Sequence, residues 1–513
     1  MSTAAENQAN SASTGVAPEE PAAFFSGRRW KAAGWALLLA YGVLLGVYFT
    51  PIAGGSDSSG YLNFADLLLR GKLIDDARPV VGIRTGSSFA TAPLGFSLEQ
   101  ETGRLIPTYP SGVPLHLAAA ELVVGRVPGM YVVGVGGALA AVVLCFAVGR
   151  ELGLSKALAA LSAAMLAWNP VFLFIAIQPL SDVLATAWCL AAIYGVLRAR
   201  RSPRWALLGG AAAAMAVLVR PTNVLIFPAL LVWMPGWRAL AWFVAGGLPG
   251  AAWMMGYQNA IYGSPLSSGY GDLWSLFRAS NLGPTVRHYG EWLPRFVPIL
   301  WILGALLLLP WARTRWRMIA GLALWFFPVA VFYVFYDVTK ETWWCLRFLL
   351  PCLPALILGG ALGIEAVRGR LSRRGTRIWT WSVAGLAVWA ALLAWNGSRG
   401  LGVFGTADSE PPYREIATWV NNHVPKNAAV VSMIASGAVH YYTDCAVLRW
   451  DMIEREEFQA FAANADLEVQ PVYALLFREE EQQAMNERLP GRWERIFENR
   501  RGAVWRMVGP MAE

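Results

Sequence analysis

Long apolar segments, separated by short polar or basic turns, fill most of the chain between residues 30 and 396. A helix that crosses a bilayer needs about 20 mainly apolar residues. Eleven segments come close to this length: residues 30–50, 129–148, 157–177, 183–198, 204–220, 222–235, 238–256, 293–311, 317–337, 344–366 and 378–396. The pattern predicts a mainly α, polytopic helical membrane protein with about eleven spans.

Basic residues between these segments orient them, because Lys and Arg of short loops stay in the cytoplasm. Basic clusters precede the first segment and lie at 198–204, 313–317 and 368–377. They fall on one side only if the apolar helix at 110–125 does not fully cross the membrane. Counting that helix as a span would reverse every later segment. We therefore expect a cytoplasmic N-terminus and a first external loop at 51–128.

The amino-acid composition changes near both ends of the chain, and these changes mark the boundaries of the expected domains. Residues 1–27 are rich in Ala, Ser, Glu and Pro, which predicts a disordered cytoplasmic tail. Residues 28–397 form the expected transmembrane domain. After Gly405, charged residues become frequent and apolar runs shorten, so 405–513 is expected to be a small α/β extracytoplasmic domain. Its predicted elements are helices at 413–423 and 479–488 and strands at 428–433 and 472–477.

The overall composition supports a membrane protein and argues against other classes. The 513 residues are 56% hydrophobic and 15% charged, whereas soluble domains carry about a quarter charged residues. A net charge of +8 is explained by the basic turns, so no nucleic-acid partner is expected. The five Cys residues show no metal-ligand spacing.

The stretch Gly54–Leu62 places Asp57 just beyond the first span, before a predicted helix over 58–69. Asp182 is likewise predicted at the outer end of a span. Carboxylates at such positions tend to be functional. Two of them can bind a divalent cation, or one can act as a general base. Alternatively, each simply caps the N-terminus of a helix.

Three basic residues are also predicted near the outer ends of helices. Arg347 lies inside an apolar helix, where a phosphate would make a bidentate partner. Lys340 could supply a second positive charge, and Arg220 precedes a helix whose free N–H groups could face an anion. The alternatives are snorkelling of Lys340 and Arg347 and interfacial anchoring of Arg220.

Aromatic residues with scattered polar groups, among them Tyr270 and His288, occupy the loop at 257–292. This combination suits contacts to a sugar or a lipid headgroup. Aromatic belts at the membrane interface would explain most of the same residues.

The order of several short motifs resembles that of the GT-C membrane glycosyltransferases, in particular the protein O-mannosyltransferase and aminoarabinose transferase-like superfamily. The resemblance covers residues 50–366. It rests on the first-loop Asp57 with its following helix, Tyr109-Pro110-Ser111-Gly112-Val113-Pro114-Leu115, Gln178-Pro179-Leu180-Ser181-Asp182, Arg220-Pro221-Thr222 and Arg347-Phe348-Leu349-Leu350-Pro351.

This resemblance implies a catalytic Asp57, a second acidic residue at Asp182 and a basic residue, Arg347, near the donor phosphate. The implied donor is a polyprenyl-phosphate-linked sugar, and the acceptor is a hydroxyl of a protein, lipid or glycan. Many relatives have two adjacent acidic residues in the first loop, whereas Ser58 follows Asp57 here. Whether Asp57 and Asp182 also hold a divalent metal is therefore left open.

We accordingly expect an integral membrane glycosyltransferase of a bacterial plasma membrane, active on the extracytoplasmic side. Lys340 and Arg220 are expected beside the donor phosphate, and Tyr61, Tyr109, Tyr270 and His288 at the sugar or acceptor. A transporter or lipid-linked-glycan flippase is the alternative. It would call for inverted repeats and polar residues near the membrane midplane, whereas these candidates gather on one external face. An inactive scaffold is a third class.

Overall fold

The computed structural model describes residues 28–83, 89–99, 102–269, 273–311, 313–368, 372–464, 467 and 469–509. The chain forms two compact units, Met1–Leu44 and Leu45–Glu513. Every described helix and strand except most of helix α2 (Arg28–Tyr48) lies in the second unit. All described candidate site residues therefore belong to one compact unit.

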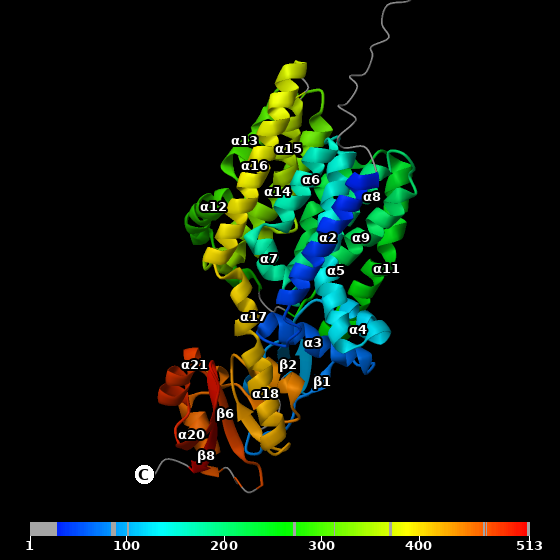
Figure 1. Cartoon of the computed structure of the whole chain (residues 1–513). Coiled ribbons are helices and arrows are strands. Elements are labelled where there is room, and N and C mark those ends of the chain that lie inside the picture. Colours follow the sequence, from blue (N-terminus) through cyan, green and yellow to red (C-terminus); the bar gives the residue numbers. More distant parts are fainter. Residues whose placement is uncertain are drawn as a thin grey trace, which may run out of the picture. The chain divides into compact units, whose positions relative to one another are not determined.

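Helices, most of them apolar, follow one another through most of this second unit (Figure 1). They are α5 (Arg126–Glu151), α6 (Lys156–Ala167), α7 (Pro170–Ala176), α8 (Ser181–Arg198), α9 (Trp205–Val219), η2 (Pro221–Ile226), α10 (Phe227–Trp233), α11 (Trp237–Tyr262), η3 (Leu273–Leu276), η4 (Ala279–Asn281), α12 (Leu282–Phe296), α13 (Ile299–Gly304), η5 (Ala305–Trp311), α14 (Trp316–Val334), η6 (Asp337–Lys340), η7 (Trp343–Leu349), α15 (Leu353–Arg368) and α16 (Arg373–Gly400). The predicted mainly α architecture is confirmed.

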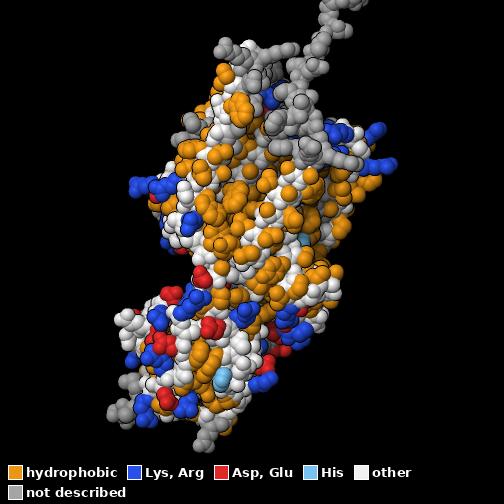
Figure 2. All heavy atoms as spheres, in the orientation of Figure 1, with side chains coloured by type: hydrophobic (Ala, Val, Ile, Leu, Met, Phe, Trp, Pro, Cys, Tyr) orange, Lys and Arg blue, Asp and Glu red, His pale blue; other side chains and the backbone are white. Residues whose placement is uncertain are grey.

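Five of the described helices, namely α2, α5, α8, α11 and α14, are long and apolar enough to cross a membrane. Three bent pairs raise this number to eight if each pair is one span: α6 with α7, Ala279–Phe296 with Trp301–Trp311, and η7 with α15. Each of the eleven predicted segments has a helical counterpart, but the number of crossings stays a prediction. Apolar side chains cover the helices on the face in Figure 2, and charged ones gather over the C-terminal elements.

The first predicted loop is more ordered than its polar, Gly-rich sequence indicates. Helix α3 (Ser56–Leu69) opens it and α4 (Gly112–Val124) closes it. Between them, β1 (Asp75–Asp76), β2 (Phe96–Glu99) and β3 (Arg104–Pro107) form an antiparallel sheet in the order β1-β3-β2, beside a short helix η1 (Phe89–Thr91). Runs of two to four residues are too short for hydrophobic alternation to identify them as strands, which explains why the prediction missed them.

A mixed five-stranded sheet, in the order β5-β4-β6-β8-β7, lies near the C-terminus. Strand β4 runs parallel to β5 and β6, whereas β8 runs antiparallel to β6 and β7. The strands of this sheet and the helices of the same region are, in chain order, η8 (Val403–Gly405), α17 (Thr406–Ser409), α18 (Pro411–His423), β4 (Ala429–Val431), α19 (Ser436–Tyr442), β5 (Ala446–Leu448), η9 (Trp450–Met452), α20 (Arg455–Asn464), β6 (Val472–Phe477), α21 (Arg478–Gln483), η10 (Ala484–Arg488), β7 (Arg492–Glu498) and β8 (Gly502–Gly509).

The predicted helix at 413–423 and strands at 428–433 and 472–477 are thus found at nearly the expected bounds, and the helix at 479–488 consists of α21 and a π-helical turn. The sequence analysis did not identify β5, β7, β8, α19 or α20. The boundaries of the predicted domains stay predictions.

The first loop contributes to both faces of the C-terminal sheet. Ala429 and Val431 of β4 pack into a core with Val80 and Ile83 of the loop. Val430, whose side chain points to the other face, lies in a second core, which also contains Ile52. The loop and the sheet therefore share their hydrophobic cores.

Polar contacts hold the same two regions together. The Arg78 guanidinium donates hydrogen bonds of 2.8, 2.8 and 3.0 Å to the carbonyl oxygens of Thr443, Cys445 and His440, which follow or end α19. The buried Asn63 amide of α3 donates to the Gly437 carbonyl at 3.0 Å. Helix α3 lies between the apolar helices and the C-terminal sheet (Figure 1), so these bonds fix its position from the sheet side.

We predict that Arg78→Ala loosens the C-terminal sheet from the first loop. The substitution leaves three carbonyl oxygens without their donor, which costs about 2–4 kcal/mol. Thermal unfolding in detergent should begin several degrees lower, and limited proteolysis should cut the loop faster. The matched control is Arg70→Ala, because Arg70 is half exposed and pairs with Asp66 on the same helix. An equal effect of both substitutions would contradict this role of Arg78.

Candidate functional site

Four charged side chains from four separate elements meet at one place in the second unit. Asp57 lies in the first turn of α3, and Asp182 lies in the first turn of α8. Arg220 follows the last residue of α9, and Arg347 belongs to η7. The helix of the first loop begins at Ser56 with Gly55 as its N-cap, so the alternative interpretation, that Asp57 is the N-cap residue, is wrong. A first-turn carboxylate still gains from the free N–H groups of the helix.

These side chains form an alternating chain of charges, the ionic cluster. Arg347 Nη1 lies 2.8 Å from Asp57 Oδ2 and 3.9 Å from Asp182 Oδ2. Arg220 Nη1 donates to Asp182 Oδ1 and, at 3.3 Å, to the Ser181 hydroxyl. Asp182 is fully buried. Because two carboxylates face two guanidinium groups, the cluster has no net charge, which is the arrangement that burial requires.

Aromatic rings and hydroxyl groups surround the guanidinium groups. The Phe348 ring lies 5.4 Å from the Arg220 guanidinium carbon and 5.3 Å from that of Arg347, within range of cation–π attraction. Tyr333 stacks on Phe348, and its hydroxyl lies 2.9 Å from the Thr222 hydroxyl. These contacts hold both arginines in fixed orientations.

Asp57 receives a second hydrogen bond, from the Tyr109 hydroxyl at 2.8 Å. Tyr109 is held in turn by the Ser56 hydroxyl at 2.7 Å. The Tyr109 ring packs on Gly60, where a Cβ atom would lie 2.5 Å from the ring and 3.0 Å from the Gly95 Cα. Only glycine at position 60 lets α3 approach Tyr109 and the turn at Gly95 this closely.

The surroundings of Asp57 decide its protonation. Burial alone would raise the pKa of the Asp57 carboxyl, but the charge of Arg347, with hydrogen bonds from Tyr109 and Arg347, lowers it below its ordinary value. Burial and the charge of Asp57 raise the pKa of Tyr109, so the phenol stays a neutral donor. Asp57 is therefore a carboxylate at neutral pH, held by Arg347 on one oxygen and Tyr109 on the other.

Two buried polar atoms of the ionic cluster have no hydrogen-bond partner among the described residues, namely Asp182 Oδ2 and Arg347 Nε. Buried polar groups are normally paired, and an unpaired one calls for an explanation such as a ligand or water. The free N–H of Arg347 is a donor still available to an anion.

The two carboxylates that were predicted as metal ligands are brought together, but their surroundings do not fit a divalent cation. Arg347 stands between Asp57 and Asp182, and Arg220 occupies an oxygen of Asp182. Two guanidinium charges beside the carboxylates would repel a cation. Within the described part of the chain, no group of three or more His, Cys, Asp or Glu side chains could hold a metal ion. Metal binding stays a prediction without support from these contacts.

The other predicted site residues lie at varying places around the cluster. The Tyr61 ring packs on Tyr109 at 5.0 Å, next to the Asp57 side chain. Lys340 Nζ lies 2.8 Å from Asp337 and donates to Asn281, so its charge is satisfied locally and no described contact joins it to the cluster. His288 is buried on α12 with Nε2 unpaired among the described residues. Tyr270 lies outside the described residues.

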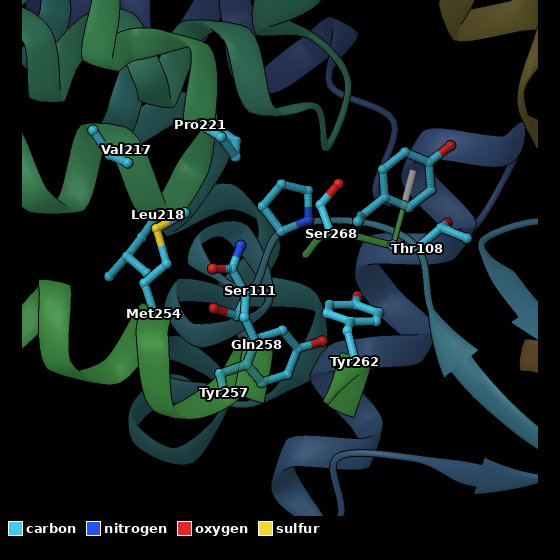
Figure 3. Close-up of a pocket in the computed structure, with 13 residues that line it drawn as sticks. Thr108, Ser111, Val217, Leu218, Pro221, Met254, Tyr257, Gln258, Tyr262 and Ser268 are labelled. Carbon is cyan, nitrogen blue, oxygen red and sulfur yellow. The ribbon is translucent and has the colours of Figure 1, made fainter. Parts of the chain in front are cut away.

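A small cleft borders the cluster on the Tyr109 side (Figure 3). It is formed by the start of α4 and the ends of α9 and α11, and Pro221 lines it next to Arg220. Gln258 is 8% exposed and its side chain faces this cleft. The described lining is uncharged. The volume of about 30 Å³ is room for about two water molecules, so a larger ligand requires these side chains to move.

A further carboxyl group reaches this region from the C-terminal elements. The Glu410 side chain lies against Gly54, where a Cβ atom would overlap the carboxylate. The groups around it are Arg501, Tyr413 and Tyr442, and the Tyr442 hydroxyl accepts a hydrogen bond from Ala53 N at 3.0 Å. Burial raises the pKa of Glu410 to about 7, although the charge of Arg501 opposes the rise.

We predict that Glu410 makes the stability of the protein depend on pH. Its pKa is raised above the unfolded value, so the protonated form stabilises the folded state at low pH and this contribution is lost as pH rises toward about 7. The melting temperature should therefore fall between about pH 5 and pH 8. Glu410→Gln should flatten this fall, whereas Glu415→Gln, on the exposed side of α18, should not. A wild-type-like slope in Glu410→Gln would exclude Glu410 as the cause.

We also predict that divalent cations do not stabilise the protein through the ionic cluster. A metal that binds the native state raises the melting temperature. After treatment with a chelator, addition of Mg²⁺ or Mn²⁺ should leave the melting temperature unchanged, because Arg220 and Arg347 together already neutralise both carboxylates. A metal-dependent increase that disappears in Asp182→Asn would show instead that the carboxylates bind the ion.

Several residues of the site were not predicted from the sequence. Phe348 directly follows Arg347, so its position next to a predicted site residue could have identified it. Tyr333 lies in the apolar run of α14, and Gln258 lies near the end of α11. A single hydroxyl or amide group in an apolar run does not indicate which residue it contacts in the fold. Glu410 reaches the loop from a distant part of the chain, which no local pattern shows.

No protein-family model matches the sequence, and no curated protein resembles it in sequence. Solved structures do resemble it. ArnT from Cupriavidus metallidurans bound to undecaprenyl phosphate has a TM-score of 0.57 and 14% identity, over 94% of this chain and all of that one. The apo oligosaccharyltransferase from Archaeoglobus fulgidus has a TM-score of 0.53 and 12% identity, over 88% of this chain and 70% of that one.

The arabinofuranosyltransferase AftD from mycobacteria has a TM-score of 0.52 and 13% identity, over 95% of this chain and 42% of that one. At such low identities, the likeness concerns the fold. All three are GT-C glycosyltransferases, so the predicted GT-C-type fold is confirmed for this chain.

Proposed function

We propose that this protein is an integral membrane glycosyltransferase that transfers a sugar from a polyprenyl-phosphate donor to an acceptor hydroxyl on the extracytoplasmic side. The observation that carries the proposal is the pairing of Asp57 with Arg347 at the junction of the apolar helices and the first loop. A base next to a cation with a free N–H suits a reaction in which a hydroxyl attacks and a phosphate leaves.

The fold supports this proposal by analogy. ArnT binds undecaprenyl phosphate, and an A. fulgidus oligosaccharyltransferase structure holds a tethered acceptor peptide with an NVT sequon. A lipid phosphate donor and an acceptor at the first loop are accordingly the substrates that we assign to this chain. The identity of the sugar is not part of the proposal.

In the proposed reaction, the acceptor oxygen attacks the anomeric carbon of the donor sugar. The new C–O bond forms as the bond between that carbon and the phosphate oxygen breaks. Asp57 takes the proton of the acceptor hydroxyl, and polyprenyl phosphate leaves with the bonding electrons. Arg347 and Arg220 stabilise the charge that grows on the phosphate. No step requires a metal ion.

The contacts of Arg347 suggest how substrate binding would activate Asp57. While Arg347 holds Asp57, the carboxylate is a weak base, because its pKa is lowered. A donor phosphate near Arg347 would compete for the same guanidinium. Asp57 would then lose part of its counter-charge and become more basic, but only with the donor present. The hydrogen bond from Tyr109 would keep the freed carboxylate in place.

We predict that Asp57→Asn lowers transfer by roughly 10²–10⁴-fold, the usual contribution of a general base. A deletion strain should lack one sugar on an envelope glycan, lipid or protein, detected by mass spectrometry. Wild-type protein should restore it and Asp57→Asn should not.

The matched control is Asp66→Asn, on the same helix α3, where the carboxylate pairs with Arg70 and Arg126 at the surface. This variant should restore the modification, with both variants present at equal levels in the membrane. Full restoration by Asp57→Asn would remove the centre of the mechanism. Lipid movement across vesicles by purified protein, without product from donor and acceptor, would favour the flippase.

A further inference from the structure

A second cleft lies at the other end of helix α9 from the ionic cluster. It has a volume of about 400 Å³ and is lined by the turn Ser202–Arg204 and by Trp237, Arg238 and Trp242 from the first turns of α11. Helix α9 has 15 residues and is therefore about 22 Å long. The cleft is distinct from the catalytic region, and the basic turn Arg198–Arg204 places it on the predicted cytoplasmic side.

The two helices that border this cleft run side by side in the same direction. Gly210 packs on the backbone of Phe243, and Gly250 further along α11 packs on Ala214 further along α9. Both N-termini therefore meet at the cleft. The first N–H groups of α9 donate to carbonyl oxygens of the preceding turn, Ser202 to Arg204, whereas those of Trp237 to Ala239 at the start of α11 have no acceptor among the described residues. The N-terminus of a helix carries partial positive charge. Neither helix has an acidic residue in its first turn or a side chain capping its N-terminus.

Two arginines add full charges to this positive end. Arg204 and Arg238 both line the cleft, and neither pairs with a carboxylate of the described residues. By contrast, Arg198 and Arg201 in the same region are bound by Glu151. The Arg238 guanidinium lies 5.6 Å from the Trp237 ring, which helps to hold it. The cleft thus combines two cations that pair with no described carboxylate and the free N–H groups at the start of α11, an environment that binds phosphate groups.

An apolar surface continues from the cleft along α11. Leu240, Val244 and Leu248 follow at helical spacing and are 38%, 51% and 59% exposed. Trp237 and Trp242 are exposed at the start of this stripe, where indole rings mark the membrane interface. A ligand with a phosphate in the cleft would lay an apolar chain on this stripe.

We propose that the cleft binds the phosphate headgroup of an anionic membrane lipid, with its hydrocarbon chain along α11. Arg204 and Arg238 hold the phosphate together with the first N–H groups of α11. The lipid occupies the opposite end of α9 from Arg220 and steadies the helix that ends at the ionic cluster. This site does not depend on the proposed transfer reaction.

The test uses the full-length protein in detergent and dioleoylphosphatidylglycerol as the probe, with dioleoylphosphatidylcholine as the zwitterionic comparison. In native mass spectrometry, the protein should retain phosphatidylglycerol in preference to phosphatidylcholine. Each arginine near an anionic lipid contributes to the free energy of lipid binding. The double variant Arg204→Gln/Arg238→Gln should therefore bind phosphatidylglycerol roughly thirty-fold more weakly than the wild type. The matched control, Arg200→Gln/Arg201→Gln, removes the same charge from the same turn, outside the cleft, and should keep wild-type affinity.

Each contrary outcome overturns a distinct part of the proposal. Equal weakening by the two double variants would mean that only the general charge of the turn matters. Unchanged binding in Arg204→Gln/Arg238→Gln would place the lipid elsewhere. Full displacement of the lipid by inorganic phosphate at the same concentration would make the cleft a site for free phosphate.

Discussion

A fully buried carboxylate must have a cation beside it, and this requirement at Asp182 organises the centre of the molecule. Transfer of an isolated carboxylate from water to an apolar interior costs several kcal/mol even after relaxation. Arg220 satisfies one oxygen, and Arg347 approaches the other while it also binds Asp57. The start of α8, the end of α9, η7 and the start of α3 therefore converge, because each brings a charge that the others must neutralise.

The position of α3 depends on more than this ionic cluster. Its apolar side packs on α4, while its polar side receives the C-terminal sheet through Asn63 and the neighbouring Arg78 bonds. The sheet in turn contains first-loop residues in both of its cores. A region that composition assigns to a separate outer domain is thus also a support for the helix that carries Asp57.

The placement of charged residues was the informative feature of the sequence. Ion pairs between residues a few positions apart were the feature that misled the prediction of site residues. Asp57, Asp182, Arg220 and Arg347 could be predicted to meet, because charged residues at the same predicted ends of apolar helices share one side of the membrane. Lys340 satisfied the same criterion, but Asp337, three residues earlier, pairs with it. The β1–β3 sheet could not be predicted, because its strands have only two to four residues. Glu410 could not be assigned either, since its position depends on how the C-terminal elements fold back.

The balance of the ionic cluster also constrains how the protein can handle an anionic substrate. Because two carboxylates and two guanidinium groups already balance, a phosphate that enters adds negative charge, and it finds a cation beside it only if an arginine changes partner. Asp182 cannot release Arg220 without becoming an unpaired buried charge, whereas Asp57 is 27% exposed and keeps its hydrogen bond from Tyr109. Arg347 is therefore the cation that can turn toward a phosphate at the lowest cost, and Asp57 is the carboxylate that can stand alone. The asymmetry in burial between the two acids assigns them different roles: Asp182 anchors the arginines, and Asp57 remains free to exchange partners.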